Sequence, residues 1–155
     1  MTPEPLSAEA FAPFGDVLEA SGPSFKINEG FCDRYTDRAR LDLDGGRFGI
    51  SLFQAAPRAL PYRCNLLERH PQGSQSFVPM TDDPFLVIVA EDEGGRPVRP
   101  RAFLTDGRQG VSYLRNTWHG VLTPLAGSGL FAVVDRIGDG PNLEEYVLDP
   151  PLIIG

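Results

Sequence analysis

The stretch Phe85-Leu86-Val87-Ile88-Val89-Ala90 is a continuous apolar run, and Arg101-Ala102-Phe103-Leu104-Thr105 follows it after an acidic, glycine-containing segment. An uninterrupted apolar run of this length, bounded by turn signals, is typical of a strand that is covered on both faces. We therefore expect the two stretches to pair as a hairpin, with Glu91 to Arg96 as its loop.

Shorter strand patterns surround this run. Phe48, Ile50 and Leu52 alternate with small or polar residues, which predicts a strand buried on one face. The chain has 17 Gly and 15 Pro, so it must contain many turns, and Pro71-Gln72-Gly73 is one of them. About ten short strands in one domain over residues 1–155 predict an all-β fold, a barrel or a jelly roll.

Only one helix is expected. Ser7 is a suitable N-cap for a short helix that begins at Ala8, and Gly15 can end it. No helical periodicity follows after residue 20, so the prediction is a β-barrel with a short N-terminal helix.

Composition excludes several classes of function. The formal net charge is -7 and the isoelectric point is near 4.7, which disfavours nucleic-acid binding because phosphates are repelled. The first residues do not resemble a signal peptide, and no apolar stretch is long enough to cross a membrane. We expect a cytoplasmic protein whose two cysteines, Cys32 and Cys64, are reduced. An anionic substrate would need a local basic group.

The only two histidines, His70 and His119, lie in polar segments at the ends of expected strands. Strand alternation places Glu68 and His70 on one face, and the following turn returns Gln75 to their neighbourhood. A buried Glu beside a His is costly unless each group is paired or binds a ligand. The structural alternative is a Glu–His pair that stabilises the turn, or a histidine that only completes a hydrogen bond.

The order of these residues is similar to the ligand pattern of cupin barrels. There, one segment carries two close ligands and a third a few residues later, and a downstream segment adds a histidine. Glu68, His70, Gln75 and His119 follow this order, with carboxylate and amide oxygens completing the shell. A divalent metal site, for Ni²⁺ or Zn²⁺, is therefore one hypothesis.

A longer series of residues resembles the bacterial ureidoglycolate lyases. Its central part is Leu67-Glu68-Arg69-His70-Pro71, with Gly73, Gln75, Phe77, Pro79 and Met80. Further matches follow in order along nearly the whole chain: Phe14-Gly15-Asp16-Val17, Arg34-Tyr35, Arg101-Ala102-Phe103, Asn116, Trp118-His119 and Val134-Asp135-Arg136. One departure is Gly120, where many members have a second histidine directly after the Trp-His pair.

The resemblance implies a cupin-like jelly-roll β-barrel, a homodimer, and cleavage of (S)-ureidoglycolate into urea and glyoxylate in allantoin and purine catabolism. This substrate carries a carboxylate, a hydroxyl and a ureido group, so the chemistry needs a base, an acid and a cation. From that chemistry we assign proton transfer or metal binding to Glu68, His70 and His119. The expected substrate contacts are Arg69 or Arg136 for the carboxylate, Gln75 and Asn116 for the ureido group, and Trp118 as a wall.

These assignments require residues 68, 70 and 119 to converge around a cavity for a two-carbon acid. Trp118 has a structural alternative, which is packing in the core. Three other functions compete: a different cupin-type enzyme such as a metal-dependent oxygenase or isomerase, a binding protein for a small carboxylate, and a dimeric scaffold without pocket chemistry.

Overall fold

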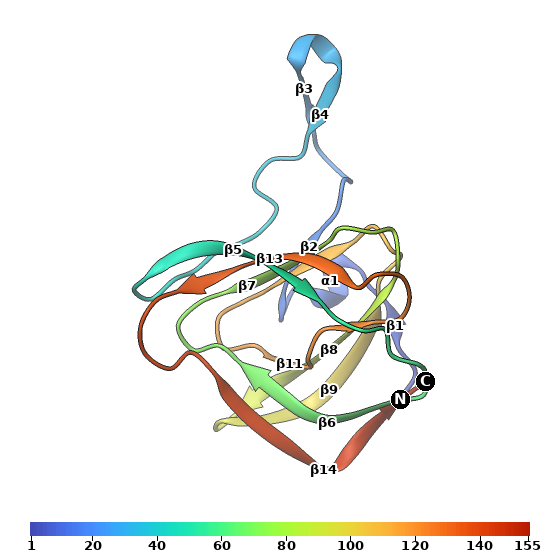
Figure 1. The fold of residues 1–155 in the computed structure, drawn as a ribbon, viewed down its shortest axis with the longest axis vertical. Helices are drawn as coiled ribbons and strands as arrows, with labels where there is room; N and C mark the ends of the chain where they lie inside the picture. The colour runs from blue at the N-terminus through green and yellow to red at the C-terminus, as the bar shows by residue number, and fades with distance from the viewer.

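The computed structural model describes all 155 residues, and strands make up most of the chain (Figure 1). Sheet A contains, in spatial order, β1 (Glu4–Pro5), β9 (Arg96–Leu104), β8 (Phe85–Glu93), β11 (Trp118–His119), β6 (Tyr62–Arg69) and β14 (Glu144–Ile154), with β12 (Thr123–Pro124) beside β8. Sheet B contains β2 (Gly15–Leu18), β10 (Gly110–Tyr113), β7 (Gln75–Pro79), β13 (Leu130–Ile137) and β5 (Arg47–Gln54). A separate hairpin pairs β3 (Phe25–Ile27) with β4 (Cys32–Arg34).

Strand β8 is buried on both faces, as its apolar run predicts. Residues 85 to 90 are each at most 2% exposed, and they divide between two cores according to strand alternation. The expected pairing with β9 is also present, since Leu86 lies opposite Leu104 and Val89 lies opposite Arg101. The hairpin is nevertheless tighter than we expected.

The predicted loop from Glu91 to Arg96 is wrong, because both strands continue into it. Glu93 pairs with Arg96, so the turn consists only of Gly94 and Gly95. Both glycines have positive φ angles, 62° and 83°, which a two-residue hairpin turn requires and which glycine adopts at little cost.

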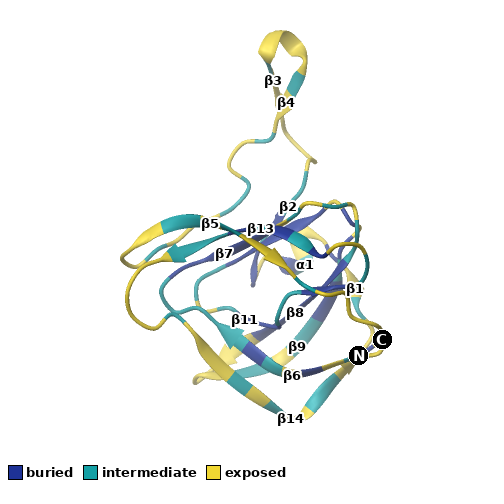
Figure 2. Cartoon of the chain, viewed as in Figure 1, coloured by how far each residue is buried: buried dark blue, intermediate teal, exposed yellow.

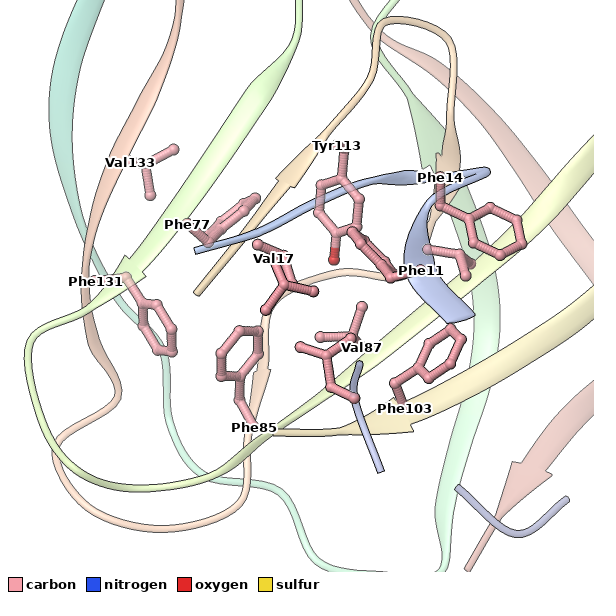
Figure 3. Close-up of a cluster of buried hydrophobic side chains, with 13 residues drawn as sticks. Phe11, Phe14, Val17, Phe77, Phe85, Val87, Phe103, Tyr113, Phe131 and Val133 are labelled. Atoms are coloured by element: carbon pink, nitrogen blue, oxygen red, sulfur yellow. The ribbon is translucent and has the colours of Figure 1, made fainter. Parts of the chain in front are cut away.

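The first core fills the space between the two sheets (Figure 3). It is rich in aromatic rings that meet edge to face; the rings of Phe85 and Phe131, for example, lie 5.0 Å apart at 81°. Its members are Leu6, Phe11, Phe14, Val17, Phe77, Phe85, Val87, Val89, Phe103, Val111, Tyr113, Phe131 and Val133.

The second core lies on the other face of sheet A, which curls so that its edge strand β14 approaches β9 (Figure 1). Ile154 is fully buried there, and Tyr146 packs its ring 6.1 Å from that of Trp118. Sheet A therefore separates two interiors. Because successive side chains of a strand point to opposite faces, the position of a residue along β6 or β11 decides which interior its side chain enters.

The short N-terminal helix is confirmed as α1 (Ala8–Phe11). Ser7 caps it, because the Ala10 N–H donates to Ser7 Oγ at 3.2 Å, and Phe11 is fully buried in the first core. A 3₁₀ turn, η1 (Asn28–Gly30), joins β3 to β4. The all-β, cupin-like barrel expected from the sequence is thus confirmed. No helix of the structure has the length and apolar character that spanning a membrane would need.

Truncation of Phe85 should be strongly destabilising, because its ring is 2% exposed and no neighbour can fill the cavity. We expect Phe85→Ala to lower the free energy of unfolding by about 3–5 kcal/mol in denaturant titrations. Val147→Ala is the control. That side chain is 74% exposed, and its loss should cost under about 1 kcal/mol. Equal losses in both variants would contradict this description of the core.

Candidate active site

Glu68, His70 and His119 converge at one end of the space between the sheets. His119 lies opposite Glu68 in the pairing of β11 with β6, and opposite residues of antiparallel strands share a face. The His70 and His119 ring centroids are 5.2 Å apart, and His119 Nδ1 is 4.0 Å from Glu68 Oε1. One ligand atom from each of the three residues can be found within 4.8 Å of the others.

His119 is held rigidly and is neutral at pH 7. It is 1% exposed, and its ring stacks on Tyr113 with centroids 4.3 Å apart and planes at 4°. Burial and the neighbouring His70 lower the pKa of His119 to about 3. Its Nδ1 lies 3.1 Å from the Gly120 carbonyl oxygen, which can only accept, so Nδ1 carries the proton. Nε2 is left with a free lone pair and has no partner.

His70 is fixed in the same way. Its Nδ1 lies 2.7 Å from the carbonyl oxygen of Asn142, so Nδ1 donates to that oxygen. Its Nε2 is also buried without a partner. The loop around it is secured because Gln72 N–H donates to Asn142 Oδ1 and Asn116 N–H donates to the His70 carbonyl.

Glu68 and His70 are both partly exposed, unlike His119; the Glu68 side chain is 22% exposed. Partial burial raises the pKa of its carboxyl group, and Glu145, directly opposite on β14, raises it further, while His70 acts in the other direction. A carboxyl group with a raised pKa is a stronger proton acceptor than an ordinary glutamate.

Gln75 joins this interior from sheet B. It is 6% exposed and lies opposite Tyr113 in the pairing of β7 with β10. Its Nε2 donates to Asp135 at 3.1 Å, and its Oε1 is buried without a partner. Sequence reasoning missed Tyr113 and Asp135 as members of the site. Strand alternation could have found them, because they follow the buried Val111 and Val133 by two residues.

Arg69 and Trp118 lie on the opposite face of sheet A, because they are the sequence neighbours of Glu68 and His119. Arg69 donates to Glu144 at 2.6 Å and to Asp92 at 2.8 Å, and its guanidinium lies 4.4 Å from the Trp118 ring centroid. The Trp118 indole N–H also donates to Asp92. The structure therefore uses both side chains to join β6, β8, β11 and β14.

Arg136 and Asn116 are also placed apart from the three residues. The Arg136 guanidinium donates to the carbonyl oxygens of Asp44, Gly45 and Asp139, which ties two loops together. Asn116 is exposed in a turn with a φ of 67° and contacts His70 through its backbone.

The cavity that we expected for a two-carbon acid is absent from the single chain. The structure has five cavities, and none is lined by Glu68, His70 or His119. The three ligand atoms lie close enough together to hold an ion.

The donor set fits a divalent metal. Two imidazoles have unpartnered Nε2 atoms, and each ring is oriented by a hydrogen bond from Nδ1 to a backbone carbonyl. Glu68 adds a carboxylate, and Gln75, opposite Tyr113, has an Oε1 that is buried without a partner. Nitrogen and oxygen ligands of this kind suit Zn²⁺ or Ni²⁺.

Comparisons with known proteins agree with the resemblance seen in the sequence. The family model described as ureidoglycolate lyase matches residues 1–155. The chain belongs to the ureidoglycolate lyase family. A protein named ureidoglycolate lyase from Rhodobacter capsulatus is 60% identical over 97% of this chain and 95% of its own length. Similar proteins of that name from Chelativorans sp. and Rhizobium meliloti are 53% and 51% identical, over 96% and 97% of this chain and 92% and 91% of their own lengths.

Gly120, where this ureidoglycolate lyase family member lacks the second histidine, does not face the site. A Cβ atom there would lie 3.1 Å from Ile88 Cβ, on the side of the second core. A side chain at position 120 would point away from His119, so the glycine removes no ligand from the cluster.

The buried His119 predicts a loss of stability in acid. Its pKa is lower in the folded protein than in the unfolded chain, so protons bind preferentially to the unfolded state as the pH falls below about 6.5. In buffer with a chelator, we expect His119 to make the folded state about 2 kcal/mol less stable at pH 5 than at pH 7.

Denaturant titrations of the wild type and His119→Gln at both pH values isolate this contribution. The variant lacks the titrating ring and should lose about 2 kcal/mol less between pH 7 and pH 5 than the wild type does. The same pH dependence in both proteins would show that His119 is not buried as a neutral ring.

Proposed function

We propose that this protein is a ureidoglycolate lyase that releases urea and glyoxylate from (S)-ureidoglycolate. Membership of the family over the entire chain supports this activity, and so do the names of its relatives. The observation that carries the proposal is the cluster of Glu68, His70 and His119, in which the Nε2 atoms of both imidazoles are buried without a partner. Unpaired buried polar atoms are costly, and a bound ligand would satisfy them.

The reaction is an elimination from the α-carbon of the substrate. The hydroxyl loses its proton as the carbonyl of glyoxylate forms, the carbon–nitrogen bond breaks, and the departing nitrogen gains a proton to become urea. The proton that leaves oxygen can be the one that nitrogen receives, so no external oxidant or reductant is needed. One group that accepts and then donates a proton is sufficient.

Glu68 is the group that we assign to this proton transfer. Its side chain is 22% exposed, and a carboxylate can accept a proton from the hydroxyl and pass it to the departing nitrogen. His70 and His119, together with one Glu68 oxygen, would hold a divalent ion, and Gln75 Oε1 is also buried without a partner. A bound ion of this kind lowers the pKa of a hydroxyl that coordinates it.

We further propose a cytoplasmic homodimer that acts on this small molecule and binds neither nucleic acid nor membrane. Both cysteines are free, which suits a reducing compartment, and the net charge of -7 opposes binding to phosphates. The outer face of sheet B supports self-association. It carries exposed apolar side chains, Ile50 (76%), Leu52 (64%), Val78 (40%) and Met80 (53%).

A second function is favoured by one feature of the same cluster. Two histidines and one carboxylate also form the donor set of iron-dependent oxygenases. Tightly bound iron together with oxygen-dependent turnover of a small acid would support that activity in place of the lyase.

Turnover tests the proposed reaction directly. We expect the purified protein to release urea and glyoxylate from (S)-ureidoglycolate faster than the spontaneous reaction, and Glu68→Gln to slow it by about a hundredfold or more. Glu93→Gln, an exposed glutamate in the β8–β9 hairpin, is the matched control and should retain the wild-type rate. No turnover by the wild type with Ni²⁺, Zn²⁺ or no metal would rule the lyase out.

Metal binding tests the role of the histidines independently of turnover. After chelation and dialysis against Ni²⁺ or Zn²⁺, the wild type should retain about one ion per chain, because the ligands are already oriented. His70→Gln and His119→Gln should each weaken binding by about 100-fold or more. Elemental analysis measures the bound metal. Unchanged binding in both variants would show that the ion is not bound by these histidines.

A further inference from the structure

One segment stands clear of both sheets (Figure 1). This arm, residues 25–34, consists of β3, η1 and β4, and most of its residues are exposed (Figure 2). Phe31, in the turn between the strands, is 90% exposed, and Phe25 is 50% exposed. Two aromatic side chains on a projecting hairpin without a core of its own indicate a surface that binds another molecule.

The arm has two different faces. Phe25 pairs with Arg34 and Ile27 with Cys32, so these four side chains share one face. The other face carries Lys26 and Asp33, which neutralise each other in an ion pair of 2.8 Å. Arg34 has no carboxylate partner; its guanidinium lies 5.7 Å from the Phe25 ring centroid. The apolar face therefore presents an unpaired positive charge.

The site of the same chain lacks such a charge. Its nearby arginines all have partners within the fold: Arg69 with two carboxylates, Arg136 with three carbonyl groups, and Arg115 with the carboxylates of the 42–44 loop. Glu145, opposite Glu68, adds negative charge at the approach, which favours a further positive group for a carboxylate substrate. The single chain also forms no cavity there. Both a free guanidinium and a cover are missing.

The outer face of sheet B shows how a second copy could supply them. Ile50 and Leu52 of β5 lie opposite outward-facing residues of β13, and Val78 continues the exposed apolar face on β7. The arm leaves the body on the side of sheet B (Figure 1). If two copies pack these faces together about a two-fold axis, each arm extends along the other copy, and the exchange is reciprocal.

We propose that a second copy of this chain packs against the outer face of sheet B and lays its arm over the site, so that Arg34 binds the substrate carboxylate. Phe31 and Phe25 of the same arm cover the opening and exclude water. A guanidinium binds a carboxylate through two parallel hydrogen bonds, which also fixes its orientation. The choice of carboxylate as the ligand rests on the proposed function; the exchange of arms between two copies does not.

Kinetics of arm variants test the role of Arg34. Arg34→Ala should raise the KM for ureidoglycolate by about 10- to 100-fold with a smaller change in kcat, and Arg34→Lys should recover part of the loss. Lys26→Ala is the matched control, because this cation lies on the opposite face of the arm and should leave KM unchanged. An unchanged KM in Arg34→Ala would overturn the assignment.

Mixing two impaired variants, assayed at substrate concentrations well below the wild-type KM, tests whether the site is shared. In a mixed dimer of Arg34→Ala and His119→Ala, one site receives both defects and the other receives neither. Random reassortment of equal amounts, by unfolding and refolding together, should restore about a quarter of the wild-type activity. If each arm serves its own chain, every site keeps one defect, and the absence of recovery would overturn the proposal.

A third experiment separates this inference from the proposed function, because it needs no turnover. Sedimentation should show a wild-type dimer and a Leu52→Arg monomer, and binding of oxalate, a dicarboxylate probe, should be lost in both Leu52→Arg and Arg34→Ala. This result in a protein that does not cleave ureidoglycolate would support the shared site and rule out the lyase activity. Turnover of ureidoglycolate by a wild type that sediments as a monomer would support the lyase activity and rule out the shared site.

Discussion

The two residues of β11 are hydrogen-bonded between β6 and β8, and the site depends on this insertion. Alternation along β11 sends Trp118 into the second core and His119 into the space between the sheets. The same alternation along β6 places the side chains of Leu67 and Arg69 on the opposite face of the sheet from that of Glu68. A shift of one residue in this register would exchange the faces, so that Trp118 replaced His119 beside Tyr113. Tight packing of Trp118 in the second core thus holds His119 in place.

The cluster is arranged so that its polar atoms remain available. Each imidazole uses Nδ1 for a backbone carbonyl and keeps Nε2 unpaired, although both Nε2 atoms are buried. Such atoms reduce the stability of the folded chain and are therefore typical of binding sites rather than of structural histidines. The fold tolerates them because two aromatic-rich cores and a long β8–β9 hairpin surround the site with well-packed side chains.

The arginines illustrate the opposite use of polar groups. Arg69 and Arg136 satisfy carboxylates and carbonyl groups that would otherwise be unpaired between strands and loops. A guanidinium with its donors fully engaged binds a further anion only at the expense of those contacts. The arm is different, since Arg34 is bound to no carboxylate and extends beyond the body. A site completed by two copies accounts for both the open cluster and the exposed apolar surfaces.

The sequence alone determined the features that depend on local periodicity. Strand alternation was enough to place Glu68 and His70 together, to predict β8 as a strand covered on both sides, and to identify Ser7 as a helix cap. Family resemblance then indicated the activity and the fold. Local patterns could not show that Arg69 and Arg136 have their donors occupied, or that Tyr113 stacks on His119. Those contacts join strands far apart in the chain, and only the tertiary structure decides which strands become neighbours and which side chains find partners.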